Sequence, residues 1–244
     1  MSTIENLFAF DFDDTLAITP SIIGVQRVSS DGKSDPGFRD WIHEYDLDIH
    51  DIENPDTDSE IIWFTSGDFA KYEKAHRLDL EYIESNSLED KYDFTETASV
   101  DVGGSSPISP ILDLLKDATT SSNSRVVIIT ARSGQAPMAG LSNRGTVSPT
   151  NRQDIQDFLS GHGINVGSGN ITTAGDLGQG PRAKVKAMKT YIDMYSPKNI
   201  LFYDDNQGNI DAIAGMCDEY FPGINIKTFK VGENGEVSLS GGCW

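Results

Sequence analysis

The sequence predicts an α/β fold built on a mostly parallel sheet. Short apolar runs at residues 7–10, 126–129 and 200–203 are typical of buried strands, because both faces of a parallel sheet are covered. Segments with the apolar spacing of helices separate such runs in the second half of the chain. Regular alternation of strands and helices defines this fold class, and its ligands bind at the carboxyl ends of the strands.

The N-terminal part shows fewer regular elements. Residues 7–10, a predicted strand, lead directly into an acidic turn. In residues 16–30 apolar and polar side chains alternate loosely, which is typical of a loop and hairpin. Residues 61–64 predict another strand, and residues 69–84 have helical spacing. A Gly- and Ser-rich segment at residues 102–107 predicts a linker back to the main body.

Strand and helix signals alternate after this linker. Ser109-Pro110 predicts the start of a helix, because proline is tolerated in the first turn. Further helices are predicted at residues 151–159, 181–195 and 209–217, and strands at residues 126–129, 171–174 and 200–203. Asn234-Gly235 predicts a hairpin turn within residues 227–239.

The composition restricts the function classes. The 244 residues include 38 acidic and 19 basic side chains, a formal net charge of −19, which disfavours binding to nucleic acid or to anionic membranes. No apolar run reaches the length of a membrane span, and residues 1–5 show no signal-peptide pattern. Cys217 and Cys243 form no metal-binding spacing and no disulfide framework. These features predict a reduced protein of the cytoplasm.

The acidic excess is concentrated in the first part of the chain. Residues 1–100 carry 24 acidic and 7 basic side chains, against 14 and 12 in residues 101–244. The densest acidic run, residues 45–60, indicates a solvated surface or adaptation to a salty or acidic setting. Its Asp56-x-Asp58-x-Glu60 spacing is similar to the start of a calcium loop, but Ile61 stands where that loop needs glycine.

Polar side chains follow the predicted strands where each strand ends, and a lysine lies near the start of a predicted helix. These candidates are Asp11, Asp13, Thr130, Arg132, Lys184, Asp204 and Asp205. Several carboxylates in one cleft repel one another unless a cation lies between them, and oxygen ligands favour Mg²⁺. Such a cation beside a hydroxyl and an ammonium group attracts a phosphoryl group. One aspartate can attack phosphorus while another transfers protons, so the set indicates two-step phosphoester hydrolysis.

This set resembles the four motifs of the haloacid dehalogenase-like (HAD) hydrolase superfamily, in the family's order. The matching residues are Asp11-Phe12-Asp13-Asp14-Thr15-Leu16, Ile129-Thr130, Lys184 and Asp204-Asp205. The resemblance implies a Rossmann-like three-layer core of residues 1–15 and 105–244. It also implies a small, acidic α/β insert, or cap, at residues 16–104. A looser similarity to small HAD hydrolases of tailed phages supports no substrate assignment.

The resemblance also implies roles for these residues. Asp11 would be the nucleophile and Asp13 the general acid/base, which favours the phosphatase branch of the family. Thr130 and Lys184 would hold the phosphoryl oxygens. Asp11, the backbone carbonyl of Asp13 and Asp205 would bind Mg²⁺. Asp204 would be a further ligand or a partner of the ligands.

Some assignments have alternatives. Lys186 is an alternative to Lys184 as the family lysine. Thr15 and Arg132 are further candidates for binding the phosphate, although Arg132 could instead pair with a surplus acid. Residues 134–149, with Arg144, predict a flexible loop near the site or a distant surface loop.

The expected function is therefore that of a Mg²⁺-dependent phosphatase for a small phosphorylated metabolite or nucleotide. It would act in the cytoplasm, or in the host cytoplasm if the protein is viral. One alternative is a polynucleotide end phosphatase, which the charge disfavours. Another is a binding module that keeps the HAD-like fold without turnover. No membrane partner is expected.

Overall fold

The chain forms two compact units in a computed structural model that describes residues 3–47, 61–93, 97, 99–134, 150–178, 180–219 and 223–244. Met1–Thr19, Ser99–Gln135 and Thr150–Trp244 belong to the first, here called the core unit. The described residues of Pro20–Ala98 belong to the second, here called the insert unit. Each unit has its own hydrophobic core.

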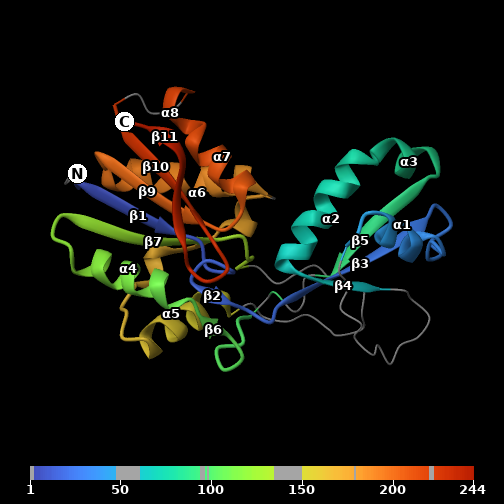
Figure 1. Ribbon diagram of the computed structural model, residues 1–244, viewed down its shortest axis with the longest axis horizontal. Helices are drawn as coiled ribbons and strands as arrows, with labels where there is room; N and C mark the ends of the chain where they lie inside the picture. Colours follow the sequence, from blue (N-terminus) through green and yellow to red (C-terminus); the bar gives the residue numbers. More distant parts are fainter. Residues whose placement is uncertain are drawn as a thin grey trace. The chain divides into compact units, whose positions relative to one another are not determined.

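A six-stranded sheet forms the centre of the core unit, in the order β11-β10-β9-β1-β7-β8 (Figure 1). Its strands are β1 (Asn6–Phe10), β7 (Ser124–Thr130), β8 (Ile171–Thr173), β9 (Asn199–Asp204), β10 (Asn225–Val231) and β11 (Val237–Cys243). Neighbouring strands are parallel, except that β11 is antiparallel to β10. The predicted α/β class with a mostly parallel sheet is confirmed. Because β1 lies between β7 and β9, the strand order reverses beside it, where open sheets bind ligands.

Helices cover both faces of this sheet (Figure 1). They are α4 (Ser109–Thr120), α5 (Asn151–Gly161), α6 (Pro181–Tyr195), α7 (Gln207–Ala214) and α8 (Met216–Glu219). Phe10, Phe12 and Ile128 pack with apolar residues of α4 and α5 in one core. Ala9, Val127 and Ile129 point to the opposite face and pack with α6 and α7. The alternation along β1 and β7 thus produces three layers.

The turn after β1 positions the first motif. The carbonyl oxygen of Phe12 accepts hydrogen bonds from the backbone N–H groups of Leu16 and Ala17, at 2.9 and 3.1 Å. Asp14 has a φ of 57°, a left-handed conformation that aspartate tolerates better than most residues. The tight turn buries Phe12 and leaves Asp11 and Asp13 at the end of the sheet.

A two-stranded ladder follows this turn. β2 (Ala17–Ile18) pairs antiparallel with β6 (Ser106–Pro107). Residues 16–19 and 99–104 therefore lie in the core unit, whereas the expected insert ran from residue 16 to residue 104. The ladder holds residues 17–18, and hydrogen bonds from Arg132 to Ser99 and from Val100 to Asp154 hold the start of the returning segment.

The insert unit contains a three-stranded antiparallel sheet in the order β4-β3-β5. Its elements are β3 (Ile22–Ser29), β4 (Ile62–Thr65), β5 (Leu88–Asp93), α1 (Phe38–Glu44), α2 (Ser66–Leu78) and α3 (Leu80–Ser85). Val25, Phe38, Trp41, Phe64 and Tyr72 form the centre of its core. The calcium-like spacing at residues 56–60 and the loop at residues 135–149 lie outside the described residues.

A disulfide joins Cys217 of α8 to Cys243 of β11. The prediction that the two cysteines form no disulfide is therefore wrong. The fold brings their Cα atoms to 5.9 Å, within the range that a disulfide needs, although no spacing in the sequence indicates it. Disulfides persist mainly in oxidising compartments, so this bond does not fit the expected reduced environment. Among the described helices, none has the length and apolar character to cross a membrane.

Candidate active site

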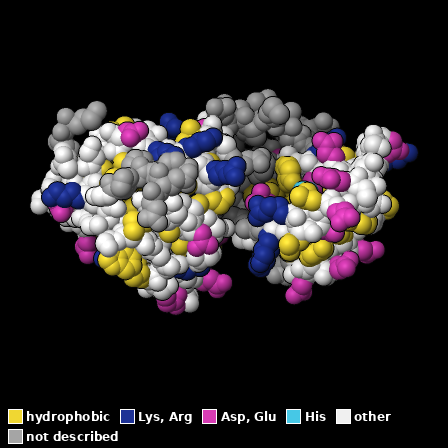
Figure 2. Space-filling view, turned by 90° about the horizontal axis from the view of Figure 1, so that it is seen from above, with side chains coloured by type: hydrophobic (Ala, Val, Ile, Leu, Met, Phe, Trp, Pro, Cys, Tyr) yellow, Lys and Arg dark blue, Asp and Glu magenta, His cyan; other side chains and the backbone are white. Residues whose placement is uncertain are grey.

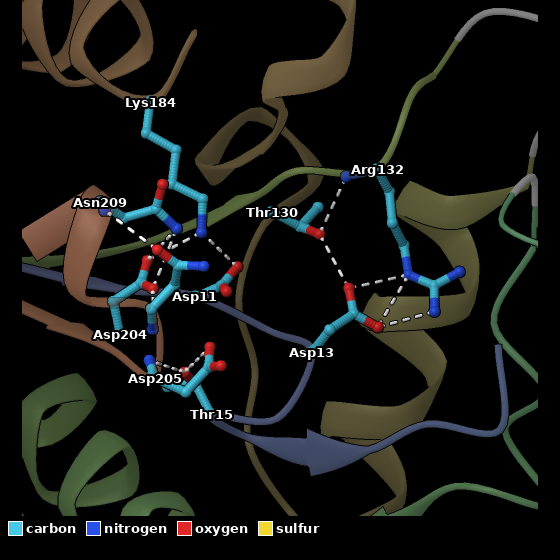
Figure 3. Close-up of polar contacts among 10 residues, drawn as sticks. Asp11, Asp13, Thr15, Thr130, Arg132, Lys184, Asp204, Asp205 and Asn209 are labelled. Carbon is cyan, nitrogen blue, oxygen red and sulfur yellow. Dashed lines mark hydrogen bonds and ion pairs between the residues drawn. The ribbon is translucent and has the colours of Figure 1, made fainter. Parts of the chain in front are cut away.

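The predicted site residues lie near the carboxyl ends of β1, β7 and β9 in two adjoining groups (Figure 3), and the second group also contains Thr19, which was not predicted. The first, here called the carboxylate cluster, consists of Asp11, Thr15, Lys184, Asp204 and Asp205. The second, here called the Asp13 cluster, consists of Asp13, Thr19, Thr130 and Arg132. Both groups lie at the strand-order reversal beside β1, where the topology predicts a ligand site.

Three carboxylates converge in the carboxylate cluster. Asp11, Asp204 and Asp205 each offer one oxygen, and these oxygens lie within 4.8 Å of one another. Lys184 reaches in from the first turns of α6, with its Nζ atom 2.8 Å from Asp11 Oδ1 and 2.8 Å from Asp204 Oδ2. Asp11, Lys184 and Asp204 are buried, whereas Asp205 is partly exposed.

Asp204 has the most hydrogen bonds of the three carboxylates. Besides Lys184, its oxygens accept from the backbone N–H of Asn206 at 2.8 Å and from Asn209 Nδ2 at 3.0 and 3.2 Å. Asn206 is also the N-cap of α7, so the start of this helix is built around the carboxylate. Asp204 is thereby fixed, and Asp11 and Asp205 retain more freedom to bind a ligand.

The carboxylate cluster carries more negative than positive charge. Burial and the neighbouring carboxylates Asp204 and Asp205 raise the pKa of Asp11 well above its usual value, against the opposing effect of Lys184. Burial and Asp204 raise the pKa of Asp205 to about 7. Burial of Lys184 favours its neutral form, but the carboxylates of Asp11 and Asp204 outweigh this and raise its pKa.

These residues fit a divalent cation. With Lys184 as the cation of the cluster, three ionised carboxylates leave an excess of about two negative charges, which a divalent ion would neutralise. The donors are all oxygens, the type that hard cations such as Mg²⁺ prefer. Asp11, Asp204 and Asp205 could therefore hold a metal ion.

The Asp13 cluster is organised around a second carboxylate. Asp13 Oδ1 accepts from Thr19 Oγ1 at 2.7 Å, and Asp13 Oδ2 accepts from Thr130 Oγ1 at 3.1 Å. Arg132 donates to both oxygens, with Nη2 at 2.7 Å from Oδ1 and Nε at 3.0 Å from Oδ2. Burial alone would raise the pKa of Asp13, but Arg132 and the two hydroxyls outweigh it and lower the pKa.

The loop after β7 is held by the 3₁₀ helix η3 (Ala174–Leu177). Asp176 accepts hydrogen bonds from Ser133 Oγ at 2.6 Å and from the backbone N–H of Gly134 at 2.8 Å. Gly175 lies so close to the loop that a Cβ atom there would be 2.7 Å from the carbonyl oxygen of Ala131. The backbone of Arg132 is therefore firmly fixed.

The structure distinguishes between the residues that the sequence left as alternatives. Lys184 contacts Asp11 and Asp204, whereas Lys186 is exposed and donates to the carbonyl oxygen of Leu177. Thr15 is buried and bonds to Asp205, accepting from its backbone N–H at 3.0 Å. Arg132 forms an ion pair with Asp13, itself a predicted site residue rather than one of the surplus surface acids.

Three residues of the site were not predicted from the sequence: Thr19, Asn206 and Asn209. Asn206 carries a recognisable signal, because an asparagine between a strand and a helix is a preferred N-cap. Asn209 follows three residues later, on the first turn of the same helix, so its position beside Asp204 follows from that cap. Thr19 has no comparable signal.

Comparisons with known proteins do not identify a relative. No family model matches the chain, and no curated protein matches it. A formyltetrahydrofolate deformylase from Pseudomonas putida KT2440 is a structural neighbour with 11% identity and a TM-score of 0.25. The match covers 86% of this chain and 68% of that one. A similarity of this degree carries no argument about fold or function.

Proposed function

We propose that the protein is a metal-dependent phosphoester hydrolase of the HAD type, with Mg²⁺ as the preferred ion. The observation that supports this most directly is the convergence of Asp11, Asp204 and Asp205 around Lys184, beside Asp13. The order of these residues along the chain is that of the HAD motifs. When bound, the ion would neutralise charge on the carboxylates and on the phosphoryl group.

In the first step, a carboxylate oxygen of Asp11 attacks phosphorus. The bond from phosphorus to the leaving oxygen breaks, and Asp13 gives that oxygen a proton. Because Arg132 keeps Asp13 ionised at rest, Asp13 must first take up this proton from solvent as the substrate binds. Lys184, held between Asp11 and Asp204, orients the nucleophile and offsets negative charge that gathers on the phosphoryl oxygens. The product of this step is an aspartyl phosphate on Asp11 and a free alcohol.

In the second step, water attacks the phosphorus of the aspartyl phosphate. Asp13, now ionised, takes a proton from the water. The acyl phosphate bond breaks, inorganic phosphate leaves and the Asp11 carboxylate is restored. Thr130 ends the neighbouring strand β7 and donates to Asp13 in the resting structure, and we assign its hydroxyl to the phosphoryl oxygens.

The surface charge favours a small substrate. On the face shown in Figure 2, acidic side chains are dispersed among neutral and basic ones. The whole chain carries a formal net charge of −19, which opposes the approach of a long polyanion. A small phosphorylated metabolite or nucleotide is therefore a better substrate candidate than a polynucleotide end.

Hydrolysis of p-nitrophenyl phosphate by the full chain tests this proposal. We expect turnover with Mg²⁺ and its loss on chelation. Asp11→Asn should lower kcat by at least about a thousandfold, because it removes the nucleophile. Asp117→Asn, at an exposed position on α4, is the matched control and should retain activity. Activity that survives Asp11→Asn would contradict the nucleophile assignment.

A further inference from the structure

Arg132 is connected to more parts of the core unit than its place after β7 suggests. Its Nε and Nη2 atoms donate to Asp13, and Nη2 also donates to Thr19 Oγ1 at 3.2 Å. Its Nη1 atom donates to the carbonyl oxygen of Ser99 at 2.8 Å and to Asn151 Oδ1 at 3.4 Å. The guanidinium is buried, so these protein groups surround it.

Two of these partners lie at the ends of the segment Pro20–Ala98, where the chain leaves the core unit for that segment and returns from it, here called the crossing points. Thr19 is the last core residue before the insert unit, and Ser99 is the first core residue after it. Neither contact is made by the insert unit itself. One guanidinium therefore joins both crossing points of the chain to the candidate proton donor, Asp13.

The core side of this connection is rigid. The backbone N–H of Arg132 donates to Thr130 Oγ1 at 3.2 Å, and its carbonyl oxygen accepts from the backbone N–H of Gly175 at 3.2 Å. Asp176 fixes the residues that follow. Because the backbone is fixed, the long side chain is the part that can respond to a shift at Thr19 or Ser99.

The arrangement also limits what Asp13 can do. Both of its oxygens accept hydrogen bonds, from Thr19, Thr130 and Arg132. A bidentate guanidinium fixes the plane of a carboxylate as well as its position. The direction in which Asp13 faces a leaving group is therefore set by its contacts with Arg132 and Thr19.

We propose that Arg132 is a positioning residue that sets the orientation of the Asp13 carboxylate from the two crossing points of the chain, Thr19 and Ser99. The inference rests on the proposed function, since it takes Asp13 as the proton donor to the leaving group. It assigns Arg132 no contact with the substrate.

The dependence on the leaving group tests this role. Phenyl phosphate and p-nitrophenyl phosphate are similar in size, but phenolate is the more basic leaving group and needs more help from a proton donor. Arg132→Met should lower kcat for phenyl phosphate on the order of tenfold more than for p-nitrophenyl phosphate, with little change in KM. Arg132→Lys should recover part of the loss, because it restores a cation beside Asp13.

Arg125→Met is the matched control, because Arg125 is exposed at the opposite end of the same strand. It should affect both substrates equally and weakly. Thr19→Val removes a hydrogen bond to Asp13 with little change in shape and should show the same leaving-group dependence as Arg132→Met, to a smaller degree. Equal losses on both substrates in the Arg132 and Thr19 variants would overturn the positioning role, while the proposed function would stand.

Hydrogen exchange tests the connection to the crossing points without any turnover. In Arg132→Met, amides in peptides covering residues 16–20 and 99–104 should exchange faster than in the wild type, while those of β9 should not change. Unchanged exchange in both peptides would overturn the inference. If the wild type hydrolyses neither ester, the proposed function fails, and exchange still decides whether Arg132 holds the crossing points.

Discussion

Lys184 occupies the most constrained position among the residues of the site. Its ammonium group lies between two buried carboxylates, at 2.8 Å from each. A buried charge is tolerated only where partners compensate for lost hydration, and here each partner compensates the other. Removal of the lysine would leave the carboxylates of Asp11 and Asp204 buried without their cation.

Lys184→Met should therefore destabilise the metal-free protein strongly. We expect a loss of about 3–5 kcal/mol in the free energy of unfolding, the usual range when one partner of a buried ion pair is removed. Urea denaturation in the presence of a chelator measures it. Lys186→Met is the control, since Lys186 is exposed two residues away, and should cost much less. Equal losses in the two variants would contradict the burial argument.

The raised pKa of Asp205 predicts how stability depends on pH. Its folded-state pKa of about 7 exceeds the value near 3.9 expected in the unfolded chain. The unfolded state therefore releases the proton first, and this group's contribution to stability falls as the pH rises from about 4 through 7. The metal-free wild type should lose stability over this range.

Asp205→Asn should lose less stability over the same range, because asparagine does not ionise. Thermal unfolding in a chelator between pH 5 and 8 measures the difference. Asp113→Asn, exposed on α4, should follow the wild type. Parallel pH profiles of the wild type and Asp205→Asn would be inconsistent with a raised pKa for Asp205.

The sequence predicted individual residues where a strand end and a motif coincide. Asp11, Asp13, Thr130, Asp204 and Asp205 all lie at the carboxyl edge where the topology rule expects them. Arg132 and Thr19 show the limit of this reasoning. Their mutual contact joins residues 113 positions apart, and no local pattern records it.

At the scale of elements, a helix was predicted with its correct bounds where the sequence carries both a start signal and a continuous apolar face. Residues 181–195 were predicted as a helix, and α6 has these bounds, because proline opens it and one face is continuously apolar. Residues 69–84 were predicted as one helix, but α2 and α3 divide at Asp79. There the Asp79 carboxylate accepts from Trp41 Nε1 at 2.6 Å, a tertiary contact that helical spacing cannot reveal.

The position of the C-terminal strand β11 indicates that the disulfide stabilises its attachment to the sheet. β11 lies at an edge of the sheet, and its first four residues are exposed, so few apolar contacts hold it there. The Cys217–Cys243 bond closes a loop of 26 positions, which corresponds to about 3.5 kcal/mol in the chain-entropy model.

Cys243→Ser should therefore lower the free energy of unfolding by about that amount, as measured by urea denaturation. A reductant should lower the stability of the wild type to the level of the variant and leave the variant unchanged. A wild type that is insensitive to reductant would show that the bond does not contribute to stability.

At the scale of the molecule, the insert unit has a core built around a buried ion pair. The Arg27 guanidinium lies 4.5 Å from the ring centre of Phe38 and 4.3 Å from that of Trp41. Its Nε atom is 2.7 Å from Asp90 Oδ1, and Tyr72 donates a hydrogen bond to the same carboxylate. Cation–π contacts and the ion pair stabilise this core independently of the carboxylate cluster.

Arg27→Met should thus destabilise the insert unit selectively. Trp41 and Trp63 are buried there, whereas Trp244 is exposed at the C-terminus, so tryptophan fluorescence reports mainly on the insert unit. The fluorescence transition in urea should shift to a lower concentration, and a circular dichroism transition from the core unit should remain in place. Arg39→Met, exposed on α1, should shift neither. A shift of both transitions together would mean that the two units unfold as one.

The site as a whole could be predicted only as a set of strand ends. Thr15 and Asp205, which are hydrogen-bonded, lie 190 positions apart. Parallel strands present their carboxyl ends at one edge of a sheet, so this rule predicts that such residues lie close together whatever their separation in the sequence. Which hydroxyl, amide or guanidinium completes each contact depends on side-chain packing, which the sequence pattern does not encode.

The short β2–β6 ladder has a consequence for how such a protein can change over time. Because Ala17 pairs with Pro107 and Ile18 with Ser106, the core unit closes its own chain before and after the insert unit. The segment Pro20–Ala98 of the insert unit lies between these strands in the sequence. A different insert could be spliced between β2 and β6 without altering the strands that carry the aspartates. The strands that carry the aspartates and the segment between β2 and β6 are thus separable units of inheritance.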